Sequence, residues 1–238
     1  MFYFLMPGLM TYNVILIAAA VIPAVFLMGK VYRSDRLEKE SPMMLRSLAL
    51  AGIFSSLIAM VLERVFGAVL DAAVRDQGLH QILLYFGVVA FSEEGAKYYL
   101  LRKRTWRSRE FNCQYDGVVY AVFVSLGFAL WENISYVMHF GFSTALVRAV
   151  TAIPGHTCFG VFRGVFYGLA KKYENRGWKE KAAPYKTLAV LIPALLHGAY
   201  DYIASTESGT WGFVGFIALL FLASYRLVGK MSRADQYI

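Results

Sequence analysis

Seven long apolar segments, separated by short clusters of charged residues, dominate this sequence. A helix needs about 17–25 mostly apolar residues to cross the hydrocarbon core of a bilayer. The segments lie near residues 8–29, 43–65, 79–101, 114–138, 144–170, 186–206 and 211–229. Only 17% of the residues are charged, too few to cover a soluble protein of this length, because soluble domains carry about 25%. The sequence therefore predicts an all-α, polytopic transmembrane helix bundle of about seven spans, forming one integral-membrane domain over residues 1–238.

The basic residues are distributed asymmetrically. They gather in the segments 30–42, 102–109, 171–186 and 226–233, whereas the alternate connections, including a polar one near residues 64–80, contain only Arg64 and Arg75. Cytoplasmic loops of membrane proteins are enriched in Lys and Arg, so this alternation predicts an N-outside, C-inside orientation. The net charge of +8 is therefore explained by basic residues that anchor the protein in a lipid bilayer. The sequence contains no nucleic-acid-binding motif, so we expect no nucleic acid as partner. No basic residue precedes Lys30, so we interpret the first segment as a retained helix.

Several ionisable residues lie inside the predicted spans, where a charged side chain costs about 2.5–3.5 kcal/mol on insertion scales. An apolar bundle has no need of so many, so we expect them to converge on one interior, water-accessible cavity. They are Glu93, Glu94, Lys97, Glu132, Arg148, His156, Arg163, His197 and Asp201. Arg148 is expected near the outer end of its span, and Arg163 deeper, as a structural counter-ion.

Helical spacing pairs some of these residues. Glu93 and Lys97 are four residues apart, so they share a helix face and can form an ion pair. With Glu94 beside them, two carboxylates compete for one cation, an arrangement typical of a general acid or base. His197 and Asp201 are also four apart, so this carboxylate can orient the imidazole. Structural ion pairs remain the alternative interpretation of each.

The fourth and fifth spans add further polar groups. Glu132 brings a third carboxylate, and Asn133 favours a polar contact between helices. Pro154 frees a backbone carbonyl beside His156 and is expected to distort that helix. Small residues recur every four positions after His156 and predict close helix packing: Gly160, Gly164 and Gly168.

Other hydrolytic signatures are absent from the sequence. There is no Gly-x-Ser-x-Gly, no His-Glu-x-x-His and no aspartate pair of the kind that aspartyl intramembrane proteases use. Cys113 and Cys158 are expected at different depths, so we predict no disulfide. Cys158 lies two residues after His156, about 200° round a helix, so the two cannot form a nucleophile–base pair.

At these residues the sequence resembles the PrsW family of intramembrane proteases, itself similar to the CAAX-prenyl and bacteriocin-processing proteases. Four motifs, in order, carry the resemblance: Glu93-Glu94-x-x-Lys97; Asp116-Gly117-x-x-Tyr120 running to Glu132-Asn133-x-x-Tyr136; Pro154-Gly155-His156-x-x-x-Gly160; and His197-Gly198-x-Tyr200-Asp201. Glu132 stands where the wider group has His, and Asp201 where it has Asn, so roles are not transferred to those two positions.

The resemblance implies a membrane-embedded protease of a prokaryotic cell membrane that cuts a single-span partner, such as an anti-sigma factor. From the residues themselves we expect Glu93 or Glu94 to act as general base, with Glu132 or His156 holding the water, and the family analogy places a metal-free glutamate mechanism first. His197, oriented by Asp201 and with Asn133 as a second donor, would stabilise the oxyanion or donate a proton, and Lys97 would keep one carboxylate ionised. A zinc-dependent version would use as ligands Glu93, Glu132, His156 and His197.

Two other functions are compatible with buried ionisable groups. A proton-coupled transporter or channel also uses Glu, His and Asp relays inside the membrane. The apolar segments show no repeated halves, which disfavours this reading. The protein could also be a non-enzymatic membrane scaffold that binds peptides, but that function does not explain the clustered carboxylates.

Overall fold

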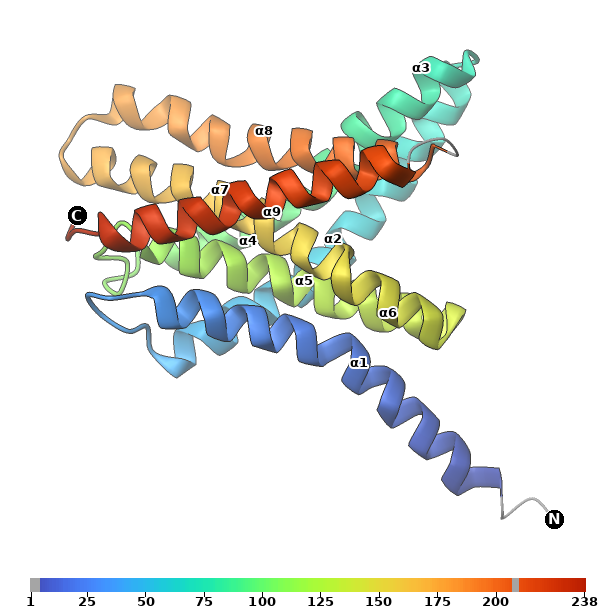
Figure 1. The fold of residues 1–238 in the computed structure, drawn as a ribbon. Coiled ribbons are helices and arrows are strands. Elements are labelled where there is room, and N and C mark those ends of the chain that lie inside the picture. The colour runs from blue at the N-terminus through green and yellow to red at the C-terminus, as the bar shows by residue number, and fades with distance from the viewer. Residues whose placement is uncertain (1–4, 207–209) are drawn as a thin grey trace.

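The computed structural model describes residues 5–206 and 210–238, with side chains from Val14 onward. Figure 1 shows the helices. They are α1 (Leu5–Ser34), α2 (Pro42–Ala73), α3 (Gln77–Ile82), α4 (Ala90–Thr105), α5 (Asp116–Phe140), α6 (Phe142–Val150), α7 (Ala152–Asn175), α8 (Lys179–Ala204) and α9 (Thr210–Arg233). A π-helical segment, η2 (Leu83–Val89), joins α3 to α4. Within the described residues only one isolated β-bridge occurs, between Cys113 and Tyr237, and the predicted all-α fold class is confirmed.

Six of the described helices or helix pairs are long and apolar enough to cross a membrane. The third predicted span, residues 79–101, is helical throughout as α3, η2 and α4, but it is not among those six. The count of seven spans therefore stays a prediction. Helix α2 continues to Ala73, so the polar connection expected near residues 64–80 is helical over its first half.

The predicted span 144–170 is divided at Thr151 into α6 and α7. Thr151 has φ −120° and ψ −69°, outside helical geometry. Pro154 follows three residues later and has no N–H to donate to the carbonyl of Val150, so the helical hydrogen bonds are interrupted here. The distortion expected from Pro154 is thus a break, and it places His156 near the start of α7.

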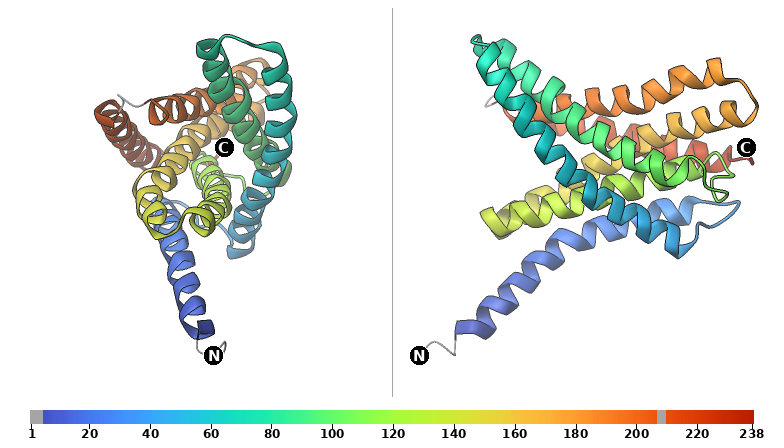
Figure 2. Two further views of the ribbon diagram at one scale, coloured as in Figure 1. Left: turned by 90° about the vertical axis from the view of Figure 1, so that its right-hand side faces the viewer. Right: turned by 180° about the vertical axis from the view of Figure 1, so that it is seen from behind.

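Helix α5 is the centre of the bundle, and its residues from Asp116 to Ala129 are all buried. It packs against α7, α2 and α1, and the end-on view in Figure 2 shows these helices around it. Glycines allow the closest approach: a Cβ on Gly164 of α7 would lie 2.3 Å from Cα of Val118 in α5. Gly160 also faces α5, and Gly168 faces Gln114 just before it, so the predicted packing role of this glycine series is confirmed.

We expect Gly164→Ala to destabilise the protein by about 1–3 kcal/mol, because the new methyl group would overlap backbone atoms of α5 that cannot rotate aside. Gly29→Ala in α1 is the matched control, since nothing lies within 4 Å of its Cβ position. Thermal unfolding of both variants in detergent, followed by loss of helical circular dichroism, measures the difference. Equal transition midpoints would contradict the close packing of α5 and α7.

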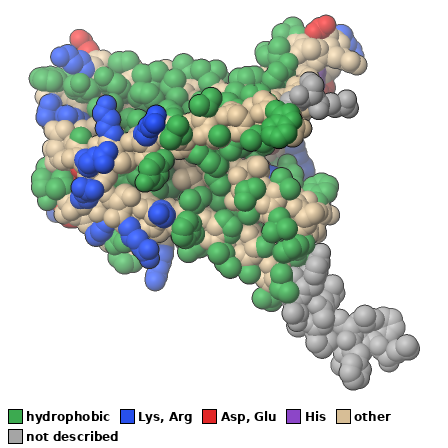
Figure 3. Space-filling view, viewed as in Figure 1, with side chains coloured by type: hydrophobic (Ala, Val, Ile, Leu, Met, Phe, Trp, Pro, Cys, Tyr) green, Lys and Arg blue, Asp and Glu red, His purple; other side chains and the backbone are tan. Residues whose placement is uncertain are grey.

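The basic segments lie together at one end of the bundle. Figure 1 shows the α1–α2, α4–α5 and α7–α8 loops and the C-terminus at its left-hand end. In Figure 3, Lys and Arg side chains gather at that end while hydrophobic side chains cover much of the remaining face. This is the distribution expected if these loops share one side of a membrane. Which side they face stays a prediction.

Candidate active site

Side chains from three helices meet at the centre of the candidate site: Glu93 and Glu94 of α4, His156 of α7 and His197 of α8. Each offers one donor atom, and these atoms lie within 4.8 Å of one another. All four residues are buried. The structure thus brings four of the five predicted catalytic residues to one point, although the first and the last are more than a hundred positions apart in the chain.

Lys97 supplies a positive charge at this centre. Its Nζ atom donates to Glu94 at 2.7 Å and to Glu93 at 3.0 Å. The same atom lies 3.3 Å from Nδ1 of His156 and 3.7 Å from the ring centroid of Phe128. The Glu93–Lys97 pair anticipated from the helical spacing is present, and Lys97 also joins α4 to α7.

Glu94 is the most enclosed carboxylate of the site, and its side chain has no exposed surface. Its Oε1 atom accepts from Lys97 and lies 3.0 Å from Nδ1 of His197. Its Oε2 atom accepts from Arg163 at 2.7 Å, and Arg163 also donates to the Glu94 backbone carbonyl at 2.8 Å. Arg163 is therefore the counter-ion of Glu94, in agreement with its expected depth.

Glu132 of α5 lies at the edge of the cluster. Its Oε2 atom is 2.9 Å from Nε2 of His156 and 3.1 Å from the guanidinium of Arg148. Arg148 was expected only near the outer end of its span, so its contact with Glu132 was missed. Asn133 is not brought into the cluster: its amide donates to the carbonyl of Ala20 in α1, and its oxygen accepts from Arg148.

His197 is held from two sides. Its Nε2 atom lies 3.4 Å from the carboxylate of Asp201, so the anticipated pair one helical turn apart is present. The ring of Phe159 stacks on the imidazole, with centroids 4.9 Å apart. Sequence analysis missed Phe159, although its position three residues after His156 puts both on one face of α7.

The site opens toward Glu132 and Asp201. Their side chains are each 23% exposed, whereas that of Glu93 is 9% exposed and that of Glu94 is fully enclosed. The least enclosed side of the cluster is therefore the one that Glu132 and Asp201 form. Of the two adjacent carboxylates, Glu93 is the less enclosed.

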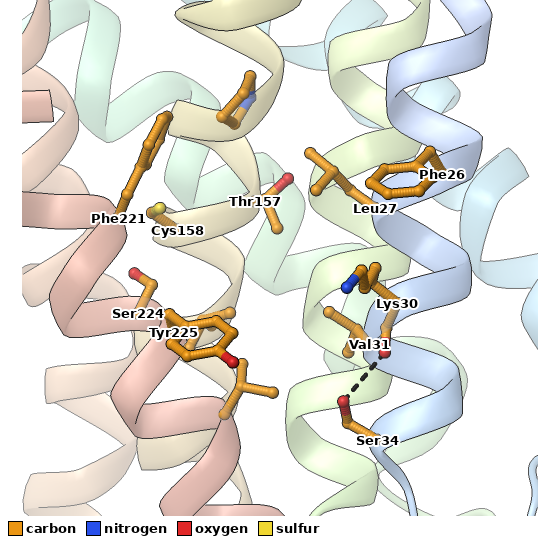
Figure 4. A pocket seen from close by; sticks show the side chains of 13 residues that line it. Phe26, Leu27, Lys30, Val31, Ser34, Thr157, Cys158, Phe221, Ser224 and Tyr225 are labelled. Atoms are coloured by element: carbon orange, nitrogen blue, oxygen red, sulfur yellow. Dashed lines mark hydrogen bonds between the residues drawn. The ribbon is translucent and has the colours of Figure 1, made fainter. Parts of the chain in front are cut away.

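A separate apolar cavity of about 350 Å³ lies between α1, α7 and α9 (Figure 4). Cys158 and Ser224 line it, and none of its described lining residues belongs to the carboxylate–histidine cluster. It is thus not the hydrated hollow expected around the carboxylates. Cys158 and Cys113 are both free, which confirms that they form no disulfide.

The donors of the cluster fit a divalent metal ion of the zinc type. Carboxylates and imidazoles are ligands that zinc takes in proteins. Glu132 and Asp201 face Nε2 of His156 and His197, as supporting carboxylates do at metal sites, which leaves Nδ1 of each ring for the centre. This set differs from the predicted ligands in one residue, because Glu94 stands where Glu132 was expected. Lys97 lies among the same donors and would compete with an ion for the carboxylates.

Comparisons with known proteins identify the family of this chain. A family model described as the PrsW family intramembrane metalloprotease matches residues 40–227. Relatives named Protease PrsW from Oceanobacillus iheyensis, Clostridioides difficile and Bacillus subtilis are 32%, 31% and 30% identical to this chain. The alignments cover 89%, 85% and 87% of this chain and 94%, 84% and 90% of the respective relatives. No solved structure matches it.

These matches confirm the resemblance and decide for a protease over a transporter. Together with the apolar helices, they make the protein an integral membrane protein of the bacterial plasma membrane. The chain belongs to the PrsW family of intramembrane proteases.

Proposed function

We propose that the cluster of Glu93, Glu94, His156 and His197 is the centre at which this protease hydrolyses a peptide bond of a membrane-anchored protein. The observation that carries the proposal is the burial of four donor atoms from three helices within 4.8 Å of one another. Ionisable groups at membrane depth are costly, and they mark functional sites by default.

Glu93 is the general base of the proposed reaction. Although buried, it is less enclosed than Glu94, and its only hydrogen bond among the described side chains is to Lys97. Glu93 would take a proton from water as the water oxygen attacks the peptide carbonyl carbon. The same proton would then pass to the leaving amine as the C–N bond breaks.

The other groups of the site position this reaction. Glu94 is fixed by Arg163, Lys97 and His197 and is therefore not free to shuttle a proton. Glu132 orients His156, and Asp201 orients His197. Asn133 bonds Ala20 and Arg148 and lies outside the cluster, so we assign it to helix packing and not to the oxyanion.

Metal dependence belongs to this proposal, because the family description names a metalloprotease and the donors fit one. We assign Glu94, His156 and His197 as the ligands, a one-carboxylate, two-histidine set of the kind that catalytic zinc sites use. A zinc-type ion held there would supply a Lewis acid toward the peptide carbonyl. Glu93 would remain free to act on water.

The proposed substrate is a single-span membrane protein, such as an anti-sigma factor, that reaches the site from the side of Glu132 and Asp201. Peptide groups of a transmembrane helix are hydrogen-bonded within the helix. A segment must therefore unwind locally before its carbonyl can meet Glu93. A single span has no neighbouring helices of its own to resist this unwinding.

Cleavage of a fluorescent single-span substrate in liposomes tests the proposal. We expect His156→Ala to abolish detectable cleavage, because it removes a donor of the cluster and the partner of Glu132. His139→Ala is the matched control, since His139 is exposed and bonds only the Ser135 carbonyl in its own helix. Normal cleavage by His156→Ala, in protein shown to be folded, would overturn the assignment. Reversible loss of activity with a chelator would support the metal.

A further inference from the structure

A second group of carboxylates lies at the end of the bundle that carries the basic loops. It consists of Asp35 and Glu40, in the loop between α1 and α2, and Asp116, the first residue of α5. One oxygen from each lies within 4.8 Å of the others. The residues are 2%, 6% and 1% exposed, so the group is enclosed by protein. Asp116 precedes Glu132 by sixteen residues on α5, about 24 Å along the helix, so this is not the proposed active site.

The hydrogen bonds around this group leave several oxygens without a partner. Tyr120 donates its hydroxyl to Glu40 at 2.6 Å, and the backbone N–H groups of Asn112 and Cys113 donate to Oδ2 of Asp116 at 3.0 and 2.7 Å. Oδ1 of Asp116 and both carboxylate oxygens of Asp35 are buried and accept no well-formed hydrogen bond from the described residues. The backbone N–H groups of Leu37 and Glu38 lie near Asp35, and the carboxyl group of Glu40 lies near Asp116.

The three carboxylates form no direct ion pair with a basic side chain among the described residues. The ammonium of Lys39 donates to the backbone carbonyls of Tyr32 and Asp35 instead. Burial raises the pKa of Glu40 to about 7 and also raises that of Asp35. Unpaired buried carboxylates are costly, so the group requires a cation or shared protons.

We propose that Asp35, Glu40 and Asp116 bind a hard divalent cation, Mg²⁺ or Ca²⁺, which joins the α1–α2 loop to the start of α5. An all-oxygen donor set selects these ions over zinc-type metals. The buried oxygens of Asp35 and Asp116, which lack a well-formed hydrogen bond from the described residues, point toward a bound ion. The proposal accounts for the Asp116-Gly117-x-x-Tyr120 motif, to which the protease centre assigns no role: Asp116 is a ligand, and Tyr120 holds the ligand Glu40.

Binding of Mg²⁺, Ca²⁺ and the luminescent calcium substitute Tb³⁺ to the full-length protein in uncharged detergent tests this site. Tyr120 hydrogen-bonds the ligand Glu40, so we expect tyrosine-sensitised Tb³⁺ emission, displaced by whichever ion binds. Thermal stability should rise with the same ion, because it binds only the folded state. Asp116→Asn and Asp35→Asn should each weaken binding at least about tenfold by removing ligand charge.

Two further variants separate this site from others. Glu180→Gln changes an exposed carboxylate at the start of α8 and should bind as the wild type does. Glu94→Gln alters the protease centre and should also retain the emission and the stabilisation, so a failure of the proposed function would not mimic a failure here. Absence of binding to wild-type protein at about 10 mM ion, beyond the weak end of calcium sites in proteins, would overturn the proposal. Emission unchanged by Asp116→Asn and by Asp35→Asn would do the same.

Discussion

Glu93→Gln is expected to lower the rate of substrate cleavage by about 10²–10⁴-fold, the usual contribution of a general base. Glutamine keeps the shape of the side chain but cannot accept the proton of water at neutral pH. The metal content of the purified variant should equal that of the wild type, because Glu93 is not one of the proposed ligands. Cleavage in liposomes and elemental analysis by mass spectrometry measure the two effects separately.

Glu94→Gln is the comparison that makes this prediction specific. Its carboxylate meets His197, Lys97 and Arg163 at the enclosed side of the centre, so we expect loss of metal together with loss of activity. His197→Ala should behave in the same way. Normal cleavage by Glu93→Gln would remove Glu93 as the base, and loss of its metal would make Glu93 a ligand. A wild-type protein that is active without metal would leave Glu93 as the base of a metal-free mechanism.

Arg163→Met is expected to destabilise the protein by about 3–5 kcal/mol, the cost of removing one partner of a buried ion pair. Arg163 has no exposed side-chain surface, and its loss leaves Glu94 with fewer donors in the interior of the bundle. It also removes the hydrogen bond to the carbonyl of Ala189 that links α7 to α8. Thermal unfolding in detergent measures the effect.

Two variants control for the loss of charge and of volume. Arg104→Met removes an exposed arginine at the end of α4 and should change stability little. The double variant Arg163→Met with Glu94→Gln should recover part of the loss, because no carboxylate is then left unpaired. If the double variant is as unstable as the sum of the two single ones, the ion pair does not couple α7 to α4.

The spacing of residues along the sequence was enough to predict several side-chain pairs of the site. The pairs Glu93–Lys97 and His197–Asp201 follow from the helical repeat, because residues four apart share a face whatever surrounds the helix. The close packing of α7 was predicted in the same way, from glycines that recur every four residues. The break at Thr151 was only partly predicted. Pro154 indicates that the helix is distorted, because it has no N–H to donate, but it does not indicate at which residue the helix ends.

The spacing of residues within one helix could not predict contacts between side chains of different helices. The bond of Glu132 to His156, the pairing of Arg163 with Glu94 and the replacement of Glu132 by Glu94 among the possible metal ligands depend on the rotation and depth of each helix. The group formed by Asp35, Glu40 and Asp116 joins a loop to a distant helix start and had no signal in sequence spacing.

The sequence by itself determined that this chain forms helices in a membrane and that its basic loops share one end. It also determined that the ionisable residues inside the spans would be expected to lie close together in the interior of the bundle. Apolar length, charge placement and helical periodicity are local properties of the chain, so they can be read in order along it. The tertiary structure alone decided which groups meet. The rotation and depth of each helix are set by close contacts such as that of Gly164 with Val118. These contacts depend on how all the helices pack together, so they cannot be derived from one segment of the sequence.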